Sequence, residues 1–431
     1  MGAALLSALR ARGGAPPPWT PANLPPGVLV GWDGRTAADL TLVSGKISAW
    51  RDRASGNHLV QATDSNRPLA GFSTLGRGIA VWGNGSSARL ITGSDIAAVK
   101  YAYCVATFFA PPSTRSTGDE LAAFSGAYQS YLTIRGVANP SHGAIVGDIG
   151  TDDLYAAAPL NGSFYIDGVL TSPPSVGRQG RRRVVEVHFA TARPVGPLGA
   201  LVYGTDGTPL PAEGALHEIV LLGASASADD RANVRTYLTD YHLAAPVVVC
   251  TLDSLSACVN ISTRQSWPWL LHRERYGGTV SVVNLGFPGQ LVTTATSGDP
   301  AKLASVKGTG RNVLVLLGGA NDILDGASAA TVWTRLQAYI SMAVTNGWQV
   351  VLCSVPNGTE VVDKYTAAHL VELGLLRDLI AAGWSAAGAA RYVDLYALSL
   401  TRQADGIHLT SGDCTTVANE IGLAVDELLA A

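Results

Sequence analysis

The apolar positions of the chain follow two different patterns, one before and one after about residue 247. In the first part, short apolar or alternating runs are separated by turn-forming clusters such as Gly83-Asn84-Gly85. Many short strands with regular turn signals are typical of an antiparallel sandwich or jelly roll. The runs are Val28–Trp32, Lys46–Trp50, Gly78–Trp82, Tyr101–Phe109, Val184–Phe189, Leu201–Tyr203 and His217–Leu222. We therefore expect an all-β domain over residues 27–243.

A single helix is predicted at the end of this domain, over Ala228–His242. Ser227 precedes it as a favourable N-cap residue. Asp229 and Asp230 place negative charge in the first turn, where the helix dipole favours it.

From Val247 onward, continuous runs rich in Val and Leu alternate with helical stretches. The predicted strands are Val247–Thr251, Val280–Leu285, Asn312–Leu317, Gln349–Val355 and Arg391–Leu395, and the clearest helices are Ala329–Asn346 and Asp363–Ala387. Such alternation predicts a parallel sheet with helices on both faces. Functional sites in these sheets form at the carboxyl ends of the strands. We expect this α/β domain to span residues 247–431.

The composition limits the classes of protein to consider. The chain has 431 residues, of which 47% are hydrophobic and 15% charged, and its formal net charge is −3. These values favour two or three packed domains and argue against disorder. They also give no electrostatic reason to expect nucleic acid or an anionic membrane as a partner. Residues 1–26, rich in Pro and Gly, are expected to be an arm or linker, with a disordered tail as the alternative.

The cysteines and the one basic run suggest no special chemistry. The five cysteines lack metal-ligand spacing, and several lie in apolar runs, where Cys behaves as a small hydrophobe. We therefore expect neither a metal site nor a cofactor. The four arginines within 178–183 are interpreted as a solvated loop.

No membrane-spanning or targeting segment is predicted. The apolar runs fall short of the ~20 residues that cross a bilayer. The first ten residues lack the basic start of a signal peptide. We expect a protein that is either cytosolic or exported without a cleaved leader.

Residues suited to acyl transfer lie where the parallel sheet would place them. Ser254 follows the first strand, Gly286 the second and Asn321 the third, and Asp405 and His408 lie in a late loop. A serine nucleophile needs a nearby base, which is usually His, and a carboxylate three residues away can orient that imidazole. The Gly286 backbone N–H and the Asn321 side-chain amide could stabilise an oxyanion. We predict that these five residues form one catalytic site.

These residues, in this order, resemble the SGNH/GDSL hydrolase family, which is named for its Ser, Gly, Asn and His. Leu409-Thr410-Ser411-Gly412 is similar to the family's closing motif. The resemblance implies a three-layer, flavodoxin-like α/β hydrolase domain from about Val247 onward. The family usually has Gly before the Asp-Ser-Leu triplet, where this chain has Leu252, and often Gly at the position of Cys258. A side chain at position 252 could crowd the nucleophile turn.

The first part of the chain resembles a concanavalin A-like (laminin G-like) jelly roll. The similarity rests on Gly31-Trp32-Asp33, on the segment from Leu40 to Asp52, on Asn66-Arg67-Pro68 and on His217-Glu218-Ile219. It implies glycan binding or a structural spacer. No sugar-binding residue stands out, because a Trp in a sandwich is more often a core residue.

Together the two resemblances suggest an esterase that removes O-acetyl or other short acyl groups from a bacterial surface polysaccharide. The combination is similar to bacteriophage tail-fibre or tailspike proteins, which implies a virion location, other tail proteins as partners and a possible homotrimer. The alternative is a virion adhesin with a degenerate, inactive hydrolase domain, which Leu252 would favour. A lipid-directed esterase is a further alternative, although no long apolar lid or basic amphipathic helix is evident.

Overall fold

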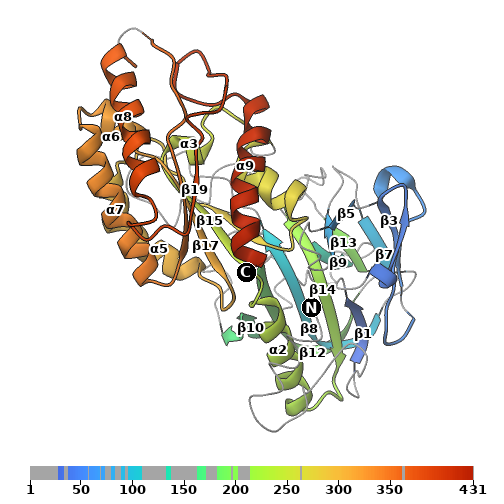
Figure 1. Cartoon of the computed structure of the whole chain (residues 1–431). Helices are drawn as coiled ribbons and strands as arrows, with labels where there is room; N and C mark the ends of the chain where they lie inside the picture. Colours follow the sequence, from blue (N-terminus) through green and yellow to red (C-terminus); the bar gives the residue numbers. More distant parts are fainter. Residues whose placement is uncertain are drawn as a thin grey trace.

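Two regions with different strand pairing make up the described part of the chain (Figure 1). The computed structural model describes residues 28–33, 37–56, 58–67, 69–72, 79–82, 89–92, 96–108, 133–136, 163–170, 182–195, 198–201, 214–262, 265–361 and 365–430. The predicted arm over residues 1–26 lies outside these residues, as do Tyr203 and the turn at Gly83-Asn84-Gly85.

The first region is a sheet in which every pairing is antiparallel. Its order is β11-β10-β12-β8-β14-β6-β5-β3-β4-β7-β13-β9, with β1 on β14 and β2 on β3. The strands are β1 (Val28–Asp33), β2 (Leu40–Val43), β3 (Lys46–Trp50), β4 (Leu59–Val60), β5 (Leu69–Phe72), β6 (Ile79–Trp82), β7 (Arg89–Thr92), β8 (Ile96–Phe108), β9 (Thr133–Gly136), β10 (Ser163–Ile166), β11 (Val169–Leu170), β12 (Arg182–Val195), β13 (Leu198–Leu201) and β14 (Gly214–Gly223). The predicted sheet-rich region is confirmed, and its jelly-roll topology stays a prediction.

Helix α2 (Ala228–His242) covers the long central strands of this sheet and has the predicted bounds. Ser227 and Asp230 form a reciprocal capping box at its start, which satisfies two backbone N–H groups. Val234 and Leu238 pack with apolar side chains of β8, β12 and β14, including Tyr103. This helix therefore buries one face of the strand triplet.

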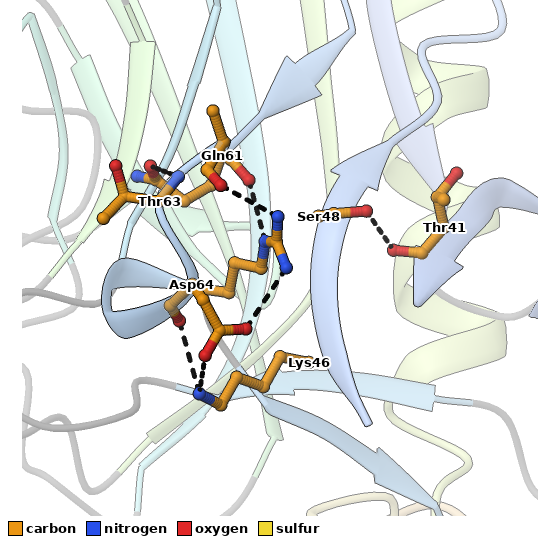
Figure 2. A network of polar contacts seen from close by, with 8 residues as sticks. Thr41, Lys46, Ser48, Gln61, Thr63 and Asp64 are labelled. Carbon is orange, nitrogen blue, oxygen red and sulfur yellow. Dashed lines mark hydrogen bonds and ion pairs between the residues drawn. The ribbon is translucent and has the colours of Figure 1, made fainter. Parts of the chain in front are cut away.

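The loop after β4 folds back on β3 through a polar network (Figure 2). Lys46 Nζ contacts Asp64 Oδ2 at 2.6 Å, and Arg67 donates to Asp64 Oδ1 and to the Gln61 carbonyl. The side chain of Gln61 accepts the Thr63 N–H. These polar groups bond to one another, and Trp50, the last residue of β3, is fully buried. Trp50 is therefore a core residue of this region and not a surface for a sugar.

The second region contains a five-stranded parallel sheet of order β16-β15-β17-β18-β19. Its strands are β15 (Val247–Leu252), β16 (Ser281–Asn284), β17 (Asn312–Leu317), β18 (Gln349–Cys353) and β19 (Arg391–Val393). Numbered along this domain the order is 2-1-3-4-5, as in flavodoxin-like folds. All five predicted strands are confirmed. Strands β15, β16 and β17 are buried throughout, β18 is buried after its first residue, and β19 is a short edge strand that is only partly buried.

Helices cover both faces of this sheet (Figure 1). One face carries α5 (Val292–Val306), α7 (Ala329–Thr345) and α8 (Ala367–Gly383), and the other carries α4 (Trp267–Leu270) and α9 (Ser411–Ala430). Short helices α3 (Ser254–Ala257) and α6 (Ala320–Leu324) follow β15 and β17, and a π-helical turn, η7 (Leu271–Arg275), follows α4. Among the helices that the structure describes, none is long and apolar enough to cross a bilayer.

Arg182, at the start of β12, joins the two regions. Its backbone N–H donates to Ser281 Oγ at 2.7 Å, and its Nη2 donates to the Thr279 carbonyl at 2.8 Å. Its Nη1 lies 3.3 Å from His242 Nδ1, and the other nitrogen of that ring lies 2.8 Å from Glu218. The expectation of a solvated arginine loop was wrong for Arg182, because this buried site supplies partners for its backbone N–H, Nη1 and Nη2, although not for its Nε.

Replacing Arg182 by methionine is expected to lower the free energy of unfolding by about 2–4 kcal/mol, since it strands buried acceptors. Urea denaturation would measure this loss. Arg391→Met is the matched control, because Arg391 pairs with Glu427 in an exposed ion pair expected to contribute less than about 1 kcal/mol. Equal losses in the two variants would contradict a structural role for the Arg182 junction.

Candidate active site

The nucleophile candidate begins helix α3 at the carboxyl end of β15. Asp253 is the N-cap of this helix, and its Oδ1 accepts the Leu255 N–H at 2.9 Å. The Ser256 hydroxyl donates to the Thr251 carbonyl at 2.8 Å, which fastens the helix back onto the strand. Ser254 lies between these anchors and is 7% exposed. Its backbone is therefore held firmly at the rim of the sheet.

Leu252 occupies the position where a Gly was expected, and it adopts a backbone conformation suited to Gly. Its φ is +90°, in the region that L side chains rarely adopt. The side chain is nonetheless buried, because Gly318, directly after the neighbouring strand β17, leaves room for it. A Cβ at Gly318 would lie 2.7 Å from Leu252 Cβ and 2.9 Å from its Cδ1. The side chain at position 252 therefore occupies space that is open because Gly318 has no side chain.

This pairing predicts coupled stability effects. Leu252→Gly removes a buried side chain at a cost of about 2–5 kcal/mol but relieves about 1–2 kcal/mol of backbone strain. Gly318→Ala alone overpacks the site by about 1–3 kcal/mol. The double variant is expected to lose at least about 1 kcal/mol less than the sum of the two, because the new methyl group enters space that Leu252 vacated. Urea denaturation of all four proteins would test this, and strict additivity would contradict it.

Asp405 and His408 form the expected carboxylate–imidazole pair. His408 Nδ1 donates to Asp405 Oδ2 at 2.6 Å, while Asp405 Oδ1 accepts the backbone N–H groups of Ile407 and His408. Although burial opposes it, these hydrogen bonds lower the pKa of Asp405 to about 2. The carboxylate therefore stays ionised, and it leaves Nε2 of the ring as the unprotonated nitrogen. That Nε2 is buried and has no hydrogen-bond partner among the described residues.

The loop that carries His408 lies against the segment that carries Ser254. Gln403 Nε2 donates both to the Leu409 carbonyl and to the Val259 carbonyl, just after α3. The thiols of Cys258 and Cys414 also contact each other. No hydrogen bond joins the Ser254 hydroxyl to His408 within the part of the chain that the structure describes. Catalytic hydrogen bonds are often long without substrate and tighten on binding.

The structure corrects the expectation for Gly286. Its backbone N–H is not free, because it donates to Asn284 Oδ1 at 3.0 Å. Asn284 Nδ2 in turn donates to the Ser256 carbonyl at 2.9 Å. A Cβ at Gly286 would lie 2.3 Å from Ala257 N, so only Gly permits this close approach. Gly286 thus packs the second strand's loop against α3 and is not an available oxyanion donor.

Asn321 and Gly289 each keep an N–H that has no acceptor among the described residues. Asn321 Nδ2 donates to the Gln290 carbonyl at 3.1 Å, which leaves the second hydrogen of that amide for another acceptor. Gly289 is exposed, has a φ of +78°, and its N–H has no acceptor among the described residues. The sequence analysis did not name Gly289. Its position three residues after Gly286, in the same loop, was the signal that could have marked it as a second candidate donor.

Asp322 is structural, because it caps α5 and not the helix in which it lies. Its Oδ2 accepts the Val292 N–H, and its Oδ1 accepts from Arg335 Nη1 at 2.7 Å. Near it, burial raises the pKa of Asp253 to about 7, and the charge of Asp322 adds to this effect. The buried carboxyl groups of Asp253 and Asp322 therefore lie near each other at the start of α3, and of these two only Asp322 is paired with a cation, Arg335.

Asp253 is expected to make stability depend on pH. The folded chain keeps the Asp253 proton up to about pH 7, whereas an unfolded chain loses it near pH 3.9. Between these values the folded state binds more protons, so stability falls as the pH rises. Asp253→Asn removes this contribution, and from pH 5 to pH 8 wild type should lose about 2 kcal/mol relative to the variant. Urea denaturation at both pH values measures this, and parallel changes would contradict it.

The five cysteines are free and buried, which confirms their reading as small hydrophobes. Burial raises the pKa of the Cys104 and Cys250 thiols, so these thiols are unreactive near neutral pH. Within the described ranges, no group of three or more His, Cys, Asp or Glu side chains is arranged to hold a metal ion.

The fold and the site together define a class of protein. A three-layer α/β domain with a 2-1-3-4-5 parallel sheet carries Ser254 after its first strand, Asn321 after its third and an Asp405–His408 pair in its last loop. Residues 253–412 match the model of the GDSL-like Lipase/Acylhydrolase family. The C-terminal domain is a GDSL/SGNH hydrolase domain, and its class of activity is carboxylic ester hydrolysis.

Solved structures give more distant likenesses. A carbohydrate acetylesterase family member from Sinorhizobium meliloti shares 16% identity over 43% of this chain and 100% of its own, with a TM-score of 0.39. The native M. smegmatis aryl esterase shares 15% identity, over 43% of this chain and 100% of its own, with a TM-score of 0.40. At these values no functional conclusion rests on them. No curated protein matches the chain.

Proposed function

We propose that the chain is a serine esterase that removes O-acetyl or similar short acyl groups from a bacterial surface polysaccharide. The observation that carries the proposal is the His408 ring. Asp405 holds it, its Nε2 has no hydrogen-bond partner among the described residues, and its loop is hydrogen-bonded to the segment just after α3. An imidazole held in this way is suited to accept a proton from Ser254.

The proposed mechanism has two steps. His408 Nε2 takes the Ser254 proton while Oγ attacks the ester carbonyl, and the resulting oxyanion accepts hydrogen bonds from Asn321 Nδ2 and the Gly289 N–H. The imidazolium then protonates the leaving alcohol, which yields an acyl-serine. Water, deprotonated by His408, attacks this ester, and Ser254 regains its proton as the acid departs. Apart from the ester and the water molecule, the groups in this scheme are side chains and a backbone N–H of the chain.

The polysaccharide substrate and the virion setting are proposed from the sequence of the whole chain. The sheet-rich N-terminal region is proposed to be the concanavalin A-like domain that holds the glycan, and the junction at Arg182 fixes it against the hydrolase domain. A phage tail location, with other tail proteins and copies of this chain as partners, would deliver the enzyme to a bacterial surface.

The second candidate, an inactive adhesin, depended on crowding by Leu252. Gly318 leaves room for that side chain, which argues against such crowding. An inactive domain remains the outcome that an absence of turnover would support.

Acetate release from a panel of O-acetylated bacterial polysaccharides would test the proposal, with the Ser254→Ala protein as blank. We expect release from at least one polysaccharide and faster hydrolysis of 4-nitrophenyl acetate than of the palmitate ester. A preference for the palmitate ester would instead indicate a lipid-directed enzyme. Acetate release that is equal in the blank would refute a serine esterase.

A further inference from the structure

A single buried carboxylate links three elements that surround the site. Asp299, on α5, is 1% exposed. Its Oδ2 accepts hydrogen bonds from Thr251 Oγ1 at 3.1 Å and from Tyr339 OH at 2.7 Å. Its Oδ1 accepts from Gln290 Nε2 at 3.4 Å and lies 3.6 Å from Lys302 Nζ. Asp299 therefore contacts the nucleophile strand, helix α7 and the turn that follows β16.

The bond to Gln290 connects Asp299 to the oxyanion donors. Gln290 directly follows Gly289, and its backbone N–H donates to the Phe287 carbonyl to close the turn. Its own carbonyl accepts from Asn321 Nδ2. Because the Gln290 side chain is hydrogen-bonded to Asp299, we expect the Gln290 carbonyl, which accepts from Asn321, to be held in place.

We propose that Asp299 is a positioning residue that orients Asn321 Nδ2 and the Gly289 N–H by way of Gln290. The inference rests on the proposed ester hydrolysis at Ser254. Asp299 itself touches no reacting atom. Its burial raises the pKa of its carboxyl, but three neighbouring donors and the Lys302 ammonium favour the acceptor form that the network needs.

Asp299→Asn is the direct test, because it keeps the shape but turns one acceptor oxygen into a donor that faces other donors. Loss of a direct oxyanion donor lowers kcat by about 10²–10³-fold. For an indirect effect we expect a fall of about 10–100-fold in kcat for 4-nitrophenyl acetate, with KM changed less than about threefold. A purely structural role would lower the thermal midpoint and leave kcat per folded enzyme unchanged.

The decisive experiment is a double-mutant cycle between Asp299 and Asn321, which do not touch. If Asp299 acts through Asn321, Asp299→Asn should lower kcat by less than about threefold in an Asn321→Ala background. The same loss of kcat in both backgrounds would overturn the proposal, as would an unchanged kcat in the single variant.

Gln290→Met provides an independent version of the test if Asp299→Asn does not fold. It removes the side-chain link and keeps the backbone carbonyl, and we expect the same 10–100-fold loss of kcat. An unchanged kcat in this variant would overturn the proposed route through Gln290. The Ser254→Ala protein separates the two proposals: if its turnover equals that of wild type, the esterase itself fails. If Ser254→Ala is inactive and the cycle shows no coupling, only the positioning role fails.

Discussion

Ser254→Ala is expected to lower kcat for 4-nitrophenyl acetate by about 10⁴- to 10⁶-fold, the scale of loss when a serine hydrolase loses its nucleophile. The hydroxyl is the group that forms the covalent intermediate, and no other described side chain of α3 can replace it. Ser256 lies two residues further on, but its hydroxyl is committed to the Thr251 and Leu317 carbonyls. Binding of substrate should survive, so KM should change far less than kcat.

Ser256→Ala is the matched control for this experiment. It removes the same atom from the same short helix and costs about 1 kcal/mol of stability through a lost hydrogen bond. We expect its kcat to stay within about tenfold of the wild-type value. Burst kinetics with the nitrophenyl ester should show one acyl-enzyme equivalent in this variant and none in Ser254→Ala. Comparable turnover in both variants would mean that the nucleophile lies elsewhere.

The elements that the sequence predicted well are those determined by local pattern. Helix α2 has the predicted bounds because a capping box marks its start. Strand β17 has the predicted bounds because it consists entirely of buried residues, nearly all of them apolar. The Asp405–His408 pair is equally local, since both residues lie in one turn. Its three-residue spacing was enough to predict the contact.

The features that were missed depend on residues far apart in the chain. Leu252 is tolerated because Gly318 faces it, and neither residue indicates the other in the sequence. The N–H of Gly286 is occupied because Asn284 turns back toward α3. The buried position of Arg182 requires acceptors from the second region, more than ninety residues later. Each is a consequence of packing between elements, which hydrophobic periodicity does not encode.

Gly286→Ala is expected to be the most disruptive glycine substitution at the site. The new Cβ would meet Ala257 N at 2.3 Å, Ser256 C at 2.7 Å and Ser256 Cβ at 2.8 Å. These are atoms of α3 near its backbone, so no flexible side chain can move aside and the helix itself must shift. We expect a loss of about 3–5 kcal/mol in the free energy of unfolding. Because Ser254 starts that helix, a displacement near 1 Å should also lower kcat by about 10²-fold or more.

Gly298→Ala is the control that separates this contact from glycine replacement in general. Gly298 lies on α5, and a Cβ there would meet nothing within 4 Å. Alanine favours helix over glycine by about 0.5–1 kcal/mol, so this variant should be slightly stabilised and fully active. Wild-type stability and turnover in Gly286→Ala would contradict the close contact between the loop after β16 and helix α3. The assignment of Gly286 to packing would then fail, and its N–H would again be a candidate for the oxyanion.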